Sequence, residues 1–447
     1  MKGIFSRKDL ARLIAPLILE LLLTLLVGMI DSIMVSSAGE PAVSGVSLID
    51  TVFQLLIYIF AAFGTGGAVV AGQYLGAGDQ HKARATTDQL VWFSGFCSLI
   101  IMAALYALKD PLLNRLFGSI TPEVHYNAKR YLMIVALSIP AISVYESGAA
   151  VFRPMGNARI TMLLSIVMNV INIVGNAVLI FGAGMGAAGA AAATVAARYV
   201  ASALMIVMLM RKKQPLYLTR SLRFVPDRHL IRRILHIGVP NGIENGLFQL
   251  GKIILASLVA SFGTSAITAN AICQVIANMQ SIPGTAVSMA AIPVIARCVG
   301  AGDEKQMRYY NRLMLAISYA VLFVFCGALW LALPLILPWY GLTAQTAMLT
   351  RQMVLVHTLG AVVIWPLTFV LPSALRAAGD VRFAMVTSVI SMFVFRLGAA
   401  YLFARNFGAG ALGVWLAMLC DWVFRASAFG FRWLSGGWKN KSVIKAP

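Results

Sequence analysis

Ionisable residues occur inside long apolar stretches of this 447-residue sequence, and Asp31 is the first whose position suggests chemistry. An unpaired charge is costly in apolar surroundings, so a carboxylate there must hold a proton, a metal cation, a basic side chain or a cationic ligand. If two of these compete for Asp31, the binding of one is coupled to the release of the other, as in an exchanger. The alternatives are an interior ion pair and a position near water at the end of the stretch.

Neutral oxygen donors recur in two later apolar stretches. Asn172 and Asn176 are four residues apart, which places both on one face of a helix. Their amide oxygens suit a hard cation such as Na⁺, and Thr194 adds a hydroxyl oxygen. Asp31, Asn172 and Asn176 are therefore candidate Na⁺ ligands. The alternative for the two amides is hydrogen bonding between helices.

Twelve apolar stretches must position these residues. Hydrophobic residues make up 60% of the sequence and charged residues only 12%, about half the charged share of a soluble chain. Runs of about 20 apolar residues span a bilayer as helices, so we predict an all-α integral membrane protein. A soluble enzyme, a disordered chain and a disulfide-rich secreted domain are excluded. The predicted spans are 13–36, 47–74, 88–108, 127–150, 160–181, 188–210, 237–261, 266–296, 313–337, 349–374, 384–404 and 410–434.

The basic residues predict the orientation. A net charge of +20 would suggest a nucleic-acid partner in a soluble protein, but here the Lys and Arg residues lie between the apolar stretches. With the N-terminus inside, the predicted inner segments hold 26 of them and the outer segments 6. Cytoplasmic loops are enriched in Lys and Arg, so we predict cytoplasmic termini and no nucleic-acid partner. The first stretch is too long for a signal peptide and has no small-x-small cleavage site before Asp31, so we expect it to remain uncleaved.

The chain resembles itself at an offset of 223–224 residues, which indicates duplication. Each half would hold six spans, so the fold class is two pseudo-symmetric six-helix lobes, 1–210 and 237–447, joined by a basic cytoplasmic linker, 211–236. Two such lobes favour a transporter that works by rocking one lobe against the other. The repeated segments are Pro16-x-x-x-Glu20 with Pro240-x-x-x-Glu244, Gly76-Ala77-Gly78-Asp79 with Gly300-Ala301-Gly302-Asp303, Arg153-x-x-Gly156-Asn157-x-Arg159-x-x-Met162 with Arg376-x-x-Gly379-Asp380-x-Arg382-x-x-Met385, and Gly189 with Gly413.

The repeated glycine-containing loops are expected to turn the chain and cap helices. No GxxxxGK[ST] or GxGxxG motif occurs in the sequence, so direct ATP hydrolysis is not predicted and an ion gradient is the default energy source.

Residues of a cleft between the two lobes are the second set of candidates. Symmetry would place Glu20 and Glu244 across it, where they could bind protons or a cationic substrate; the alternative is ion pairing with Lys252 or another base. Lys252 is predicted to neutralise an acidic cleft residue, although anion binding is also open. Gln54 and Asn278 match at the same offset and are expected to line the cleft.

Other charged residues receive structural roles or none. Asp421 and Arg425 are four apart and are predicted to form a structural pair within one helix. Asp50 is expected near the end of a span, where water reaches it. The sequence assigns no role to Glu146, Arg198 and Arg396.

Taken together, these motifs resemble the multidrug and toxic compound extrusion (MATE) family over essentially the whole chain. The resemblance implies a MATE-like fold and an antiporter that exports organic, often cationic, compounds against Na⁺ or H⁺ entry. The motifs that carry it are Pro16 with Asp31-Ser-Ile-Met-Val, Gly39, Ala42 and Gly45, Gly72-Gln73-x-Leu75-Gly76-Ala77-Gly78-Asp79, the Arg153 motif, Asn169-x-x-Asn172-x-x-x-Asn176, Ile180-Phe181-Gly182, Gly189 to Thr194, Gly238-x-Pro240 with Glu244, and Ala374-Leu375-Arg376-x-x-Gly379-Asp380.

The resemblance also implies that Asp31, Asn172, Asn176 and Thr194 form a cation or proton site in the first lobe. Many relatives have an aspartate where this chain has Asn176, so the site here carries one formal negative charge. NorM-type relatives usually have an essential aspartate in the tenth span, but this chain has no acidic residue between Glu304 and Asp380. The first-lobe site is therefore the favoured one.

The predicted function is an antiporter that exports amphipathic, cationic organic compounds in exchange for Na⁺ or H⁺, with no other cofactor. It is expected to work as a monomer among membrane lipids in a bacterial inner membrane. The alternative is a flippase of lipid-linked saccharides or peptidoglycan precursors from the same wider superfamily. Such flippases usually show a cluster of cleft arginines, whereas this cleft is expected to be net acidic. No HExxH or nucleophile–base motif indicates an enzyme.

Overall fold

The computed structural model describes residues 4–116, 120–219 and 225–444. Within these ranges the chain is helical and contains no strand, as the predicted all-α class requires. Twelve segments are long and apolar enough to cross a membrane, which confirms the predicted number. They are Arg7–Ser36, Glu40–Gly76, Gln80–Ala107, Pro122–Phe152, Ala158–Gly182, Ala187–Leu209, Arg228–Ala260, Thr264–Gly300, Glu304–Tyr340, Ala344–Val363, Val381–Asn406 and Gly410–Leu434.

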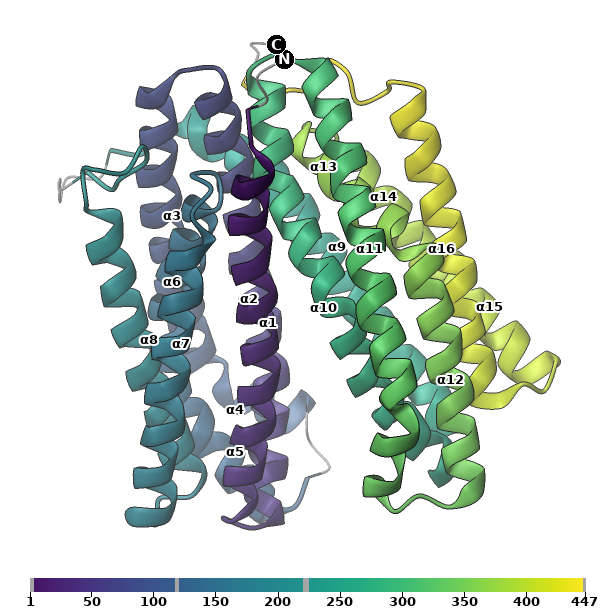
Figure 1. Ribbon diagram of the computed structural model, residues 1–447. Coiled ribbons are helices and arrows are strands. Elements are labelled where there is room, and N and C mark those ends of the chain that lie inside the picture. The colour runs from purple at the N-terminus through teal and green to yellow at the C-terminus, as the bar shows by residue number, and fades with distance from the viewer. Residues whose placement is uncertain (1–3, 117–119, 220–224, 445–447) are drawn as a thin grey trace. The chain divides into compact units, whose positions relative to one another are not determined.

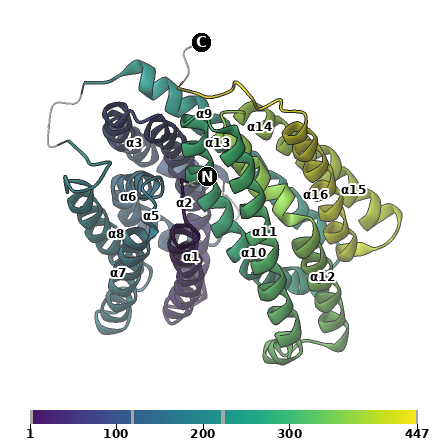
Figure 2. The same ribbon diagram turned by 45° about the horizontal axis from the view of Figure 1, so that its top comes forward.

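The chain folds as two compact units, which we call the first unit (Arg7–Gly238) and the second unit (Met1–Ser6 with Val239–Pro447). In the first unit, helices α7 and α8 run side by side (Figures 1 and 2). Its helical elements before the boundary are α1 (Arg7–Ser36), α2 (Glu40–Gly76), α3 (Gln80–Ala107), α4 (Lys109–Pro111), η1 (Leu112–Leu116), α5 (Pro122–Val135), η2 (Ala136–Ser138), α6 (Ile139–Phe152), α7 (Ala158–Asn176), η3 (Ala177–Gly182) and α8 (Ala187–Leu209).

The second unit begins within α9 (Arg228–Ala260), and its helices α10, α11 and α12 pack side by side (Figure 1). Several of its spans are interrupted by short π-helical turns. The remaining elements are α10 (Thr264–Gly300), α11 (Glu304–Ile336), η4 (Leu337–Tyr340), α12 (Ala344–Val363), η5 (Pro366–Val370), α13 (Leu371–Ala377), α14 (Val381–Ile390), η6 (Ser391–Leu397), α15 (Gly398–Tyr401), η7 (Leu402–Asn406) and α16 (Gly410–Leu434).

The core of the first unit forms where α2 packs on α5 and α6. Ile49 and Phe60 of α2 are fully buried there with Leu132 of α5 and Ile139 of α6. The backbones approach closely, because a Cβ added at Gly45 would lie 2.8 Å from the backbone nitrogen of Ala128. This packing holds α2 and α5 in fixed positions from which their polar side chains project.

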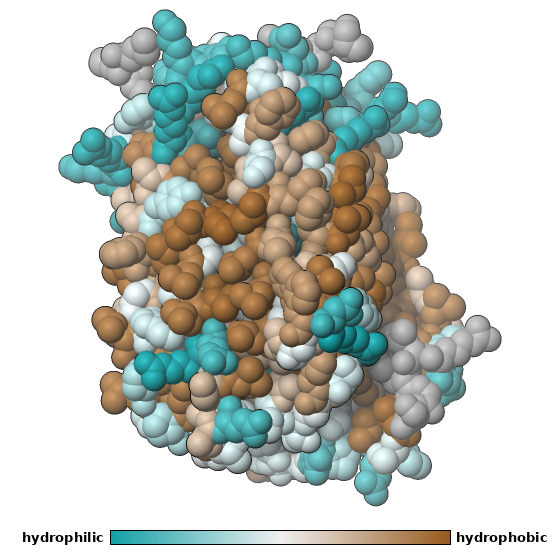
Figure 3. Space-filling model, turned by 90° about the vertical axis from the view of Figure 1, so that its right-hand side faces the viewer, coloured by the Kyte–Doolittle hydropathy of each residue, from teal (hydrophilic) through white to brown (hydrophobic). Residues whose placement is uncertain are grey.

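The surface of the spans is apolar. On the face shown in Figure 3, hydrophobic side chains form a broad middle band, and hydrophilic ones gather above and below it. Because no water hydrogen-bonds to backbone groups inside a bilayer, helices that satisfy their own backbone groups are the stable way to cross it. The chain is therefore a multi-pass membrane protein.

Both ends of the described chain lie at the same end of the second unit. The backbone N–H of Ile4 donates to Oε1 of Gln306 at 2.8 Å, and Lys439 pairs with Glu304 at 2.9 Å. Both partners belong to the first turn of α11. Both chain ends lie on the same side when a chain crosses the membrane an even number of times.

The tenth span differs from its prediction as one helix over 349–374. Helix α12 ends at Val363, and a π-helical turn, Pro366–Val370, precedes α13. Proline has no N–H to continue the helical hydrogen bonding, so the helix ends before it. The hydroxyl of Thr368 donates to the carbonyl oxygen of Trp422 at 3.0 Å, which ties the interrupted segment to α16.

The π-helical turn Ser391–Leu397 coincides with a change in the internal offset. Arg153 and Met162 match Arg376 and Met385 at an offset of 223, whereas Gly189 matches Gly413 at 224. A π-turn contains one more residue than the corresponding α-helical turn. One extra residue in η6 therefore accounts for the change, because the corresponding helix α7 is regular over Ala158–Asn176.

The repeated Gly-Ala-Gly-Asp loops cap helices, as predicted. Gly78 and Gly302 have φ of 80° and 68°, which a residue with a Cβ adopts only with strain. The carboxylates of Asp79 and Asp303 accept from backbone N–H groups three residues later, each at 2.9 Å. The N–H donated by Lys82 holds the pKa of Asp79 below its ordinary value. The other repeated loop also turns and caps in this way, since Gly156 and Gly379 have φ of 75° and 95°. The N–H groups of Asn157 and Asp380 donate to the carbonyl oxygens of Phe152 and Leu375 at 3.2 and 3.0 Å, although neither residue caps the following helix with its side chain.

We expect Gly413→Ala to destabilise the protein, because a Cβ at position 413 would lie 2.7 Å from backbone atoms of Phe403 and Ala404. Backbone atoms cannot move aside as a flexible side chain can, so overpacking should cost about 1–3 kcal/mol in the free energy of unfolding. Thermal unfolding in detergent measures this loss. Gly430→Ala is the matched control in α16, since nothing lies within 4 Å of its added Cβ. Equal midpoints for the two variants would contradict the prediction.

Candidate functional site

A cavity of about 100 Å³ in the first unit contains three of the four predicted coupling-site residues. Asp31 comes from α1, Asn176 from α7 and Thr194 from α8. Asp50 from α2 and Tyr131 from α5 add a second carboxylate and a phenolic hydroxyl to its lining. The other residues that line it are Gly28, Ser32, Val35, Val43, Val46, Ser47 and Ala190.

Hydrogen bonds join all four predicted residues around Asp31. Nδ2 of Asn176 donates to Oδ1 of Asp31 at 2.9 Å. With the amide nitrogen of Asn172 toward the carboxylate, it donates to the two oxygens at 2.7 and 2.9 Å, and Oδ1 of Asn172 accepts from the Thr194 hydroxyl at 3.1 Å. An ionised Asp31 is fully satisfied by these amide N–H groups.

The opposite orientation of the Asn172 amide gives a second complete network. Its oxygen would then face the Asp31 carboxylate at 2.7 Å, a length at which an O–H···O hydrogen bond forms if Asp31 carries a proton. Nδ2 of Asn172 would donate to Thr194 Oγ1 at 3.1 Å, and that hydroxyl donates to the carbonyl oxygen of Ala190 at 2.9 Å. The two networks differ by one amide rotation and one proton.

A buried acceptor without a partner also lies at this site. Asn176 is 1% exposed, and its Oδ1 makes no hydrogen bond. An unsatisfied buried acceptor is unusual and calls for a proton donor, a water or a cation. With the Asp31 carboxylate and the Thr194 hydroxyl, it completes the type of oxygen donor set that a hard cation accepts.

Asp50, Tyr131 and Arg198 belong to this site, although the sequence analysis assigned no site role to any of them. The Tyr131 hydroxyl donates to Asp50 at 3.0 Å. Arg198 donates to the Ser138 hydroxyl at 2.7 Å, and its charge acts on both Asp50 and Asp31. Asp50 is exposed on its unit, in keeping with the expectation that water reaches it. One signal was available, since Thr194 and Arg198 are four residues apart on one helix.

Glu20 lies in the first unit beside the arginine of a repeated loop. It accepts from the Thr161 hydroxyl at 3.0 Å, and the charged group that acts most strongly on it is Arg153. The side chain is half-buried.

Glu244 lies in the second unit and is paired with the corresponding arginine. Both of its oxygens accept from Nη2 of Arg376, at 2.6 and 2.7 Å, and Glu244 is only 4% exposed. The ion-pair alternative therefore describes Glu244, with Arg376 and not Lys252 as the base. The sequence held the signal for this pairing, because both acids and both arginines recur at nearly the same offset.

Two further predictions about charge pairs were wrong. Asp421 accepts from the Ser391 hydroxyl at 2.5 Å and lies 3.5 Å from Arg396, whereas Arg425 lies 3.9 Å from Glu244. The two side chains four residues apart on α16 thus have different partners. Lys252 forms no ion pair with any described residue, and the charge that acts on it is that of Arg396, another cation.

The predicted cleft amides lie outside the Asp31 cavity. Gln54 of α2 and Asn278 of α10 are both exposed on their own units. Asn278 accepts from Nε2 of Gln274, one turn earlier, at 3.2 Å. Neither residue contributes to the network around Asp31.

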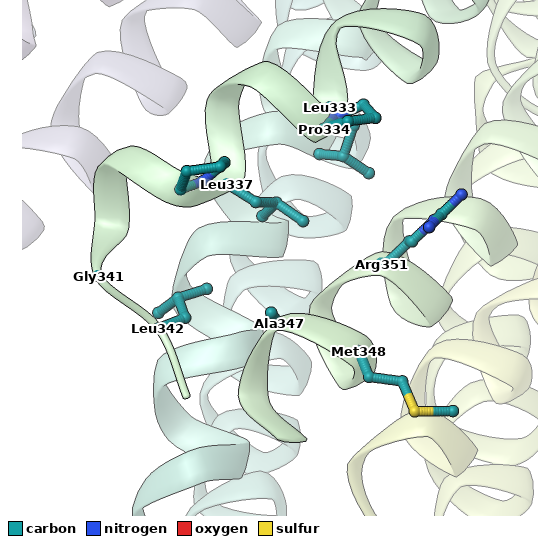
Figure 4. Close-up of a pocket in the computed structure, with 9 residues that line it drawn as sticks. Leu333, Pro334, Leu337, Gly341, Leu342, Ala347, Met348 and Arg351 are labelled. Atoms are coloured by element: carbon teal, nitrogen blue, oxygen red, sulfur yellow. The ribbon is translucent and has the colours of Figure 1, made fainter. Parts of the chain in front are cut away.

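A larger cavity of about 450 Å³ lies between the end of α11 and the start of α12 (Figure 4). Its lining is apolar except for Arg351, and it includes Leu333, Leu337, Leu342 and Met348. None of the predicted site residues lies there. Its size alone does not make it a site for ion exchange, because it offers no carboxylate.

Comparison with known proteins agrees with these observations. The model of the MatE family matches residues 16–178 and again residues 240–402. The chain is 28% identical to the uncharacterized transporter YisQ of Bacillus subtilis, over 96% of this chain and 94% of that one. It is 26% identical to the probable multidrug resistance protein NorM of Thermotoga maritima, over 98% and 94% of the two chains.

Solved structures share the fold. An outward-facing multidrug resistance MATE family transporter of the MOP superfamily superposes with a TM-score of 0.87 at 21% identity, covering 97% of this chain and 96% of that one. A crystal structure of MATE in the bent conformation gives a TM-score of 0.87 at 20% identity, covering 98% and 97%. The predicted MATE-like fold is thus confirmed.

Proposed function

Because the chain belongs to the MatE family of multidrug and toxic compound extrusion transporters, we propose that it exports organic compounds in exchange for an ion that binds at Asp31. Its relatives include probable multidrug resistance proteins, and members of the family are transporters and not enzymes. The observation that carries the proposal is the hydrogen-bonded cluster of Asp31, Asn172, Asn176 and Thr194 beside a cavity.

The two networks around Asp31 support a specific ion step. In the ionised state the Asn172 amide nitrogen serves the carboxylate, and in the protonated state the amide oxygen accepts the carboxyl proton. The Thr194 hydroxyl donates to Asn172 in the ionised state and to the carbonyl oxygen of Ala190 in the protonated state. Binding of a proton therefore requires only the rotation of the Asn172 amide. Binding of Na⁺ between the same two oxygens would require them to move apart, because an oxygen–Na⁺–oxygen bridge is longer than the 2.7 Å that separates them. We infer that H⁺ is the preferred coupling ion and that Na⁺ is the competing candidate.

Coupling follows if the organic substrate and the ion favour different conformations of the protein. A ligand shifts a conformational equilibrium only by its difference in affinity for the two states. Protonation of Asp31 removes a negative charge from the cavity that also contains Asp50 and so changes the stability of the packing around α1. We propose that the two halves, derived by duplication, rock against each other in response.

The remaining assignments follow from the same proposal. The basic inner loops favour cytoplasmic termini in a bacterial inner membrane. Each copy of the chain holds one complete Asp31 cluster, which supports a functional monomer surrounded by lipid. Beyond the coupling ion, the proposal calls for no cofactor.

Transport by purified protein in liposomes tests the proposal. Rhodamine 123, an organic cation, and rhodamine 110, the same dye with a free carboxylate, serve as substrates. The membrane potential is clamped with potassium and valinomycin, so that only an imposed pH or Na⁺ gradient can drive accumulation. We expect the pH gradient to drive accumulation of at least one dye. If neither gradient drives either dye, the proposed antiport is refuted.

A further inference from the structure

The spans of the second unit contain more cations than carboxylates. Each of the three buried carboxylates of this unit already has an arginine: Glu244 has Arg376 at 2.6 Å, Asp380 has Arg432 at 2.7 Å, and Asp421 has Arg396 at 3.5 Å. Arg425 lies 3.9 Å from Glu244, which already holds Arg376, and Lys252 forms no ion pair with any described residue. Inside a membrane, uncompensated charges are costly and mark functional positions.

Arg425 is buried without the hydrogen bonds that a guanidinium normally makes. Its side chain is 3% exposed, and its Nε and Nη1 have no hydrogen-bond partner. The rings of Phe369 and Phe248 lie 4.8 and 5.0 Å from the guanidinium carbon. These rings stabilise the guanidinium charge only in part, so the free N–H groups of Arg425 remain available to an anion.

Lys252 lies on the same face of α9 as the residues that contact Arg425. Glu244, Phe248 and Lys252 are spaced by four residues, which aligns them along one helical face. One position earlier on α9, Gly251 lies directly against Met392 of η6, the element that also carries Arg396. Lys252 is exposed on its unit.

Arg396 is the second accessible cation of this group. Its side chain is 17% exposed, and its Nε has no partner. Its charge acts unfavourably on both Lys252 and Arg425. Like charges that are held together repel each other, so a bound anion would stabilise all three.

The internal offset matches this arginine with a residue of the ion site of the first unit. The offset of 223–224 pairs Asn172 with position 395 or 396. Where the first unit has an amide that serves a carboxylate, the second unit has a guanidinium. The two halves have therefore diverged in charge at corresponding places, and they would select ligands of opposite sign.

We propose that Lys252 and Arg396, with the charge of Arg425 behind them, bind an anionic group of the transported compound. The group would be a carboxylate, sulfonate or phosphate, because the planar guanidinium matches two oxygens at once and the ammonium adds a point charge. This inference rests on the proposed transport function and narrows its substrate class. The preferred substrates are organic zwitterions or anions, and not simple cations.

Binding of the two rhodamines tests this site separately from transport. Fluorescence anisotropy with the purified protein gives a dissociation constant for rhodamine 110 and for rhodamine 123, which differ only by methylation of the carboxylate. A charge-assisted hydrogen bond corresponds to about tenfold or more in affinity. We expect wild type to bind the free carboxylate about tenfold more tightly than the ester.

Three variants show which residues produce this preference. Lys252→Met should lower the ratio of affinities toward one. Arg396→Lys should also lower it, and this variant retains a positive charge for Asp421 if a neutral substitution fails to fold. Lys305→Met is the control, since Lys305 is an exposed residue at the start of α11 and its loss changes the net charge equally.

The outcomes separate the two proposals. A preference for the carboxylate that disappears in Lys252→Met but persists in Lys305→Met supports the anion site. Gradient-driven accumulation of rhodamine 123 with no preference for rhodamine 110 would overturn the anion site and leave the proposed antiport intact. Carboxylate binding without gradient-driven accumulation of either dye would support the anion site and overturn the proposed antiport.

Discussion

We expect Asp31→Asn to abolish gradient-driven accumulation of dye while the protein stays folded. An asparagine cannot take up a proton, so the rotation of the Asn172 amide loses its trigger. If Na⁺ is the ion, the site loses its one formal charge, and a charge-assisted contact corresponds to at least about a tenfold loss of affinity. Accumulation in the proteoliposome assay measures this effect.

Folding should survive this substitution for a local reason. An asparagine at position 31 can still accept from Asn176 through its oxygen and can donate to the Asn172 oxygen once that amide rotates. The variant thus imitates the protonated state. Dye should still equilibrate across the membrane, but without a gradient-dependent rise above equilibrium.

Asp110→Asn is the matched control for Asp31→Asn. Asp110 lies outside the spans and pairs with Lys129 at 2.8 Å on the surface, an interaction worth little to stability. It removes the same charge and should accumulate dye as wild type does. Full gradient-driven accumulation by Asp31→Asn would show that the coupling ion binds elsewhere.

Glu244→Gln should cause the largest loss of stability of any charge substitution proposed for this protein. The substitution leaves Arg376 without its bidentate partner and Arg425 without the carboxylate 3.9 Å away. Removing one member of a buried ion pair typically costs about 3–5 kcal/mol, because the remaining charge stays buried without compensation. Thermal unfolding in detergent should therefore show a much lower midpoint than wild type.

The double variant Glu244→Gln, Arg376→Gln should recover much of this loss, since it removes both members of the pair. Glu20→Gln is the matched variant in the first unit and should cost less, because Glu20 is only half-buried and forms its hydrogen bond with a neutral hydroxyl. If Glu244→Gln keeps the wild-type midpoint but loses transport, Glu244 is a proton or substrate site, as the sequence analysis suggested, and the ion pair is secondary.

The coupling site was predictable to the extent that its residues are unusual where they occur. Asp31, Asn172 and Asn176 interrupt apolar stretches, and polar groups there need partners. Their joint arrangement came from the family resemblance and not from spacing, since three separate helices supply them. Tyr131 and Asp50 gave no comparable signal, because a tyrosine in a span is ordinary and an aspartate can lie at a span end.

The charge pairs of the second unit show where such inference stops. Asp421 and Arg425 satisfy the spacing rule for a helical pair, but that pair is worth only about 0.2–0.5 kcal/mol on a helix surface. Here Asp421 contacts Ser391 and Arg396, while Arg425 lies among phenyl rings. Burial and packing against neighbouring helices outweigh the local pairing.

The number of spans, the helical class and the spacing of the repeated motifs could all be read from the sequence, because hydropathy and turn chemistry act over short stretches of chain. The boundaries of the tenth span and the partners of Glu244 and Asp421 required the folded chain. Those depend on how each helix is rotated and on which helix it meets, and residues 132 positions apart, such as Glu244 and Arg376, come together only through that packing.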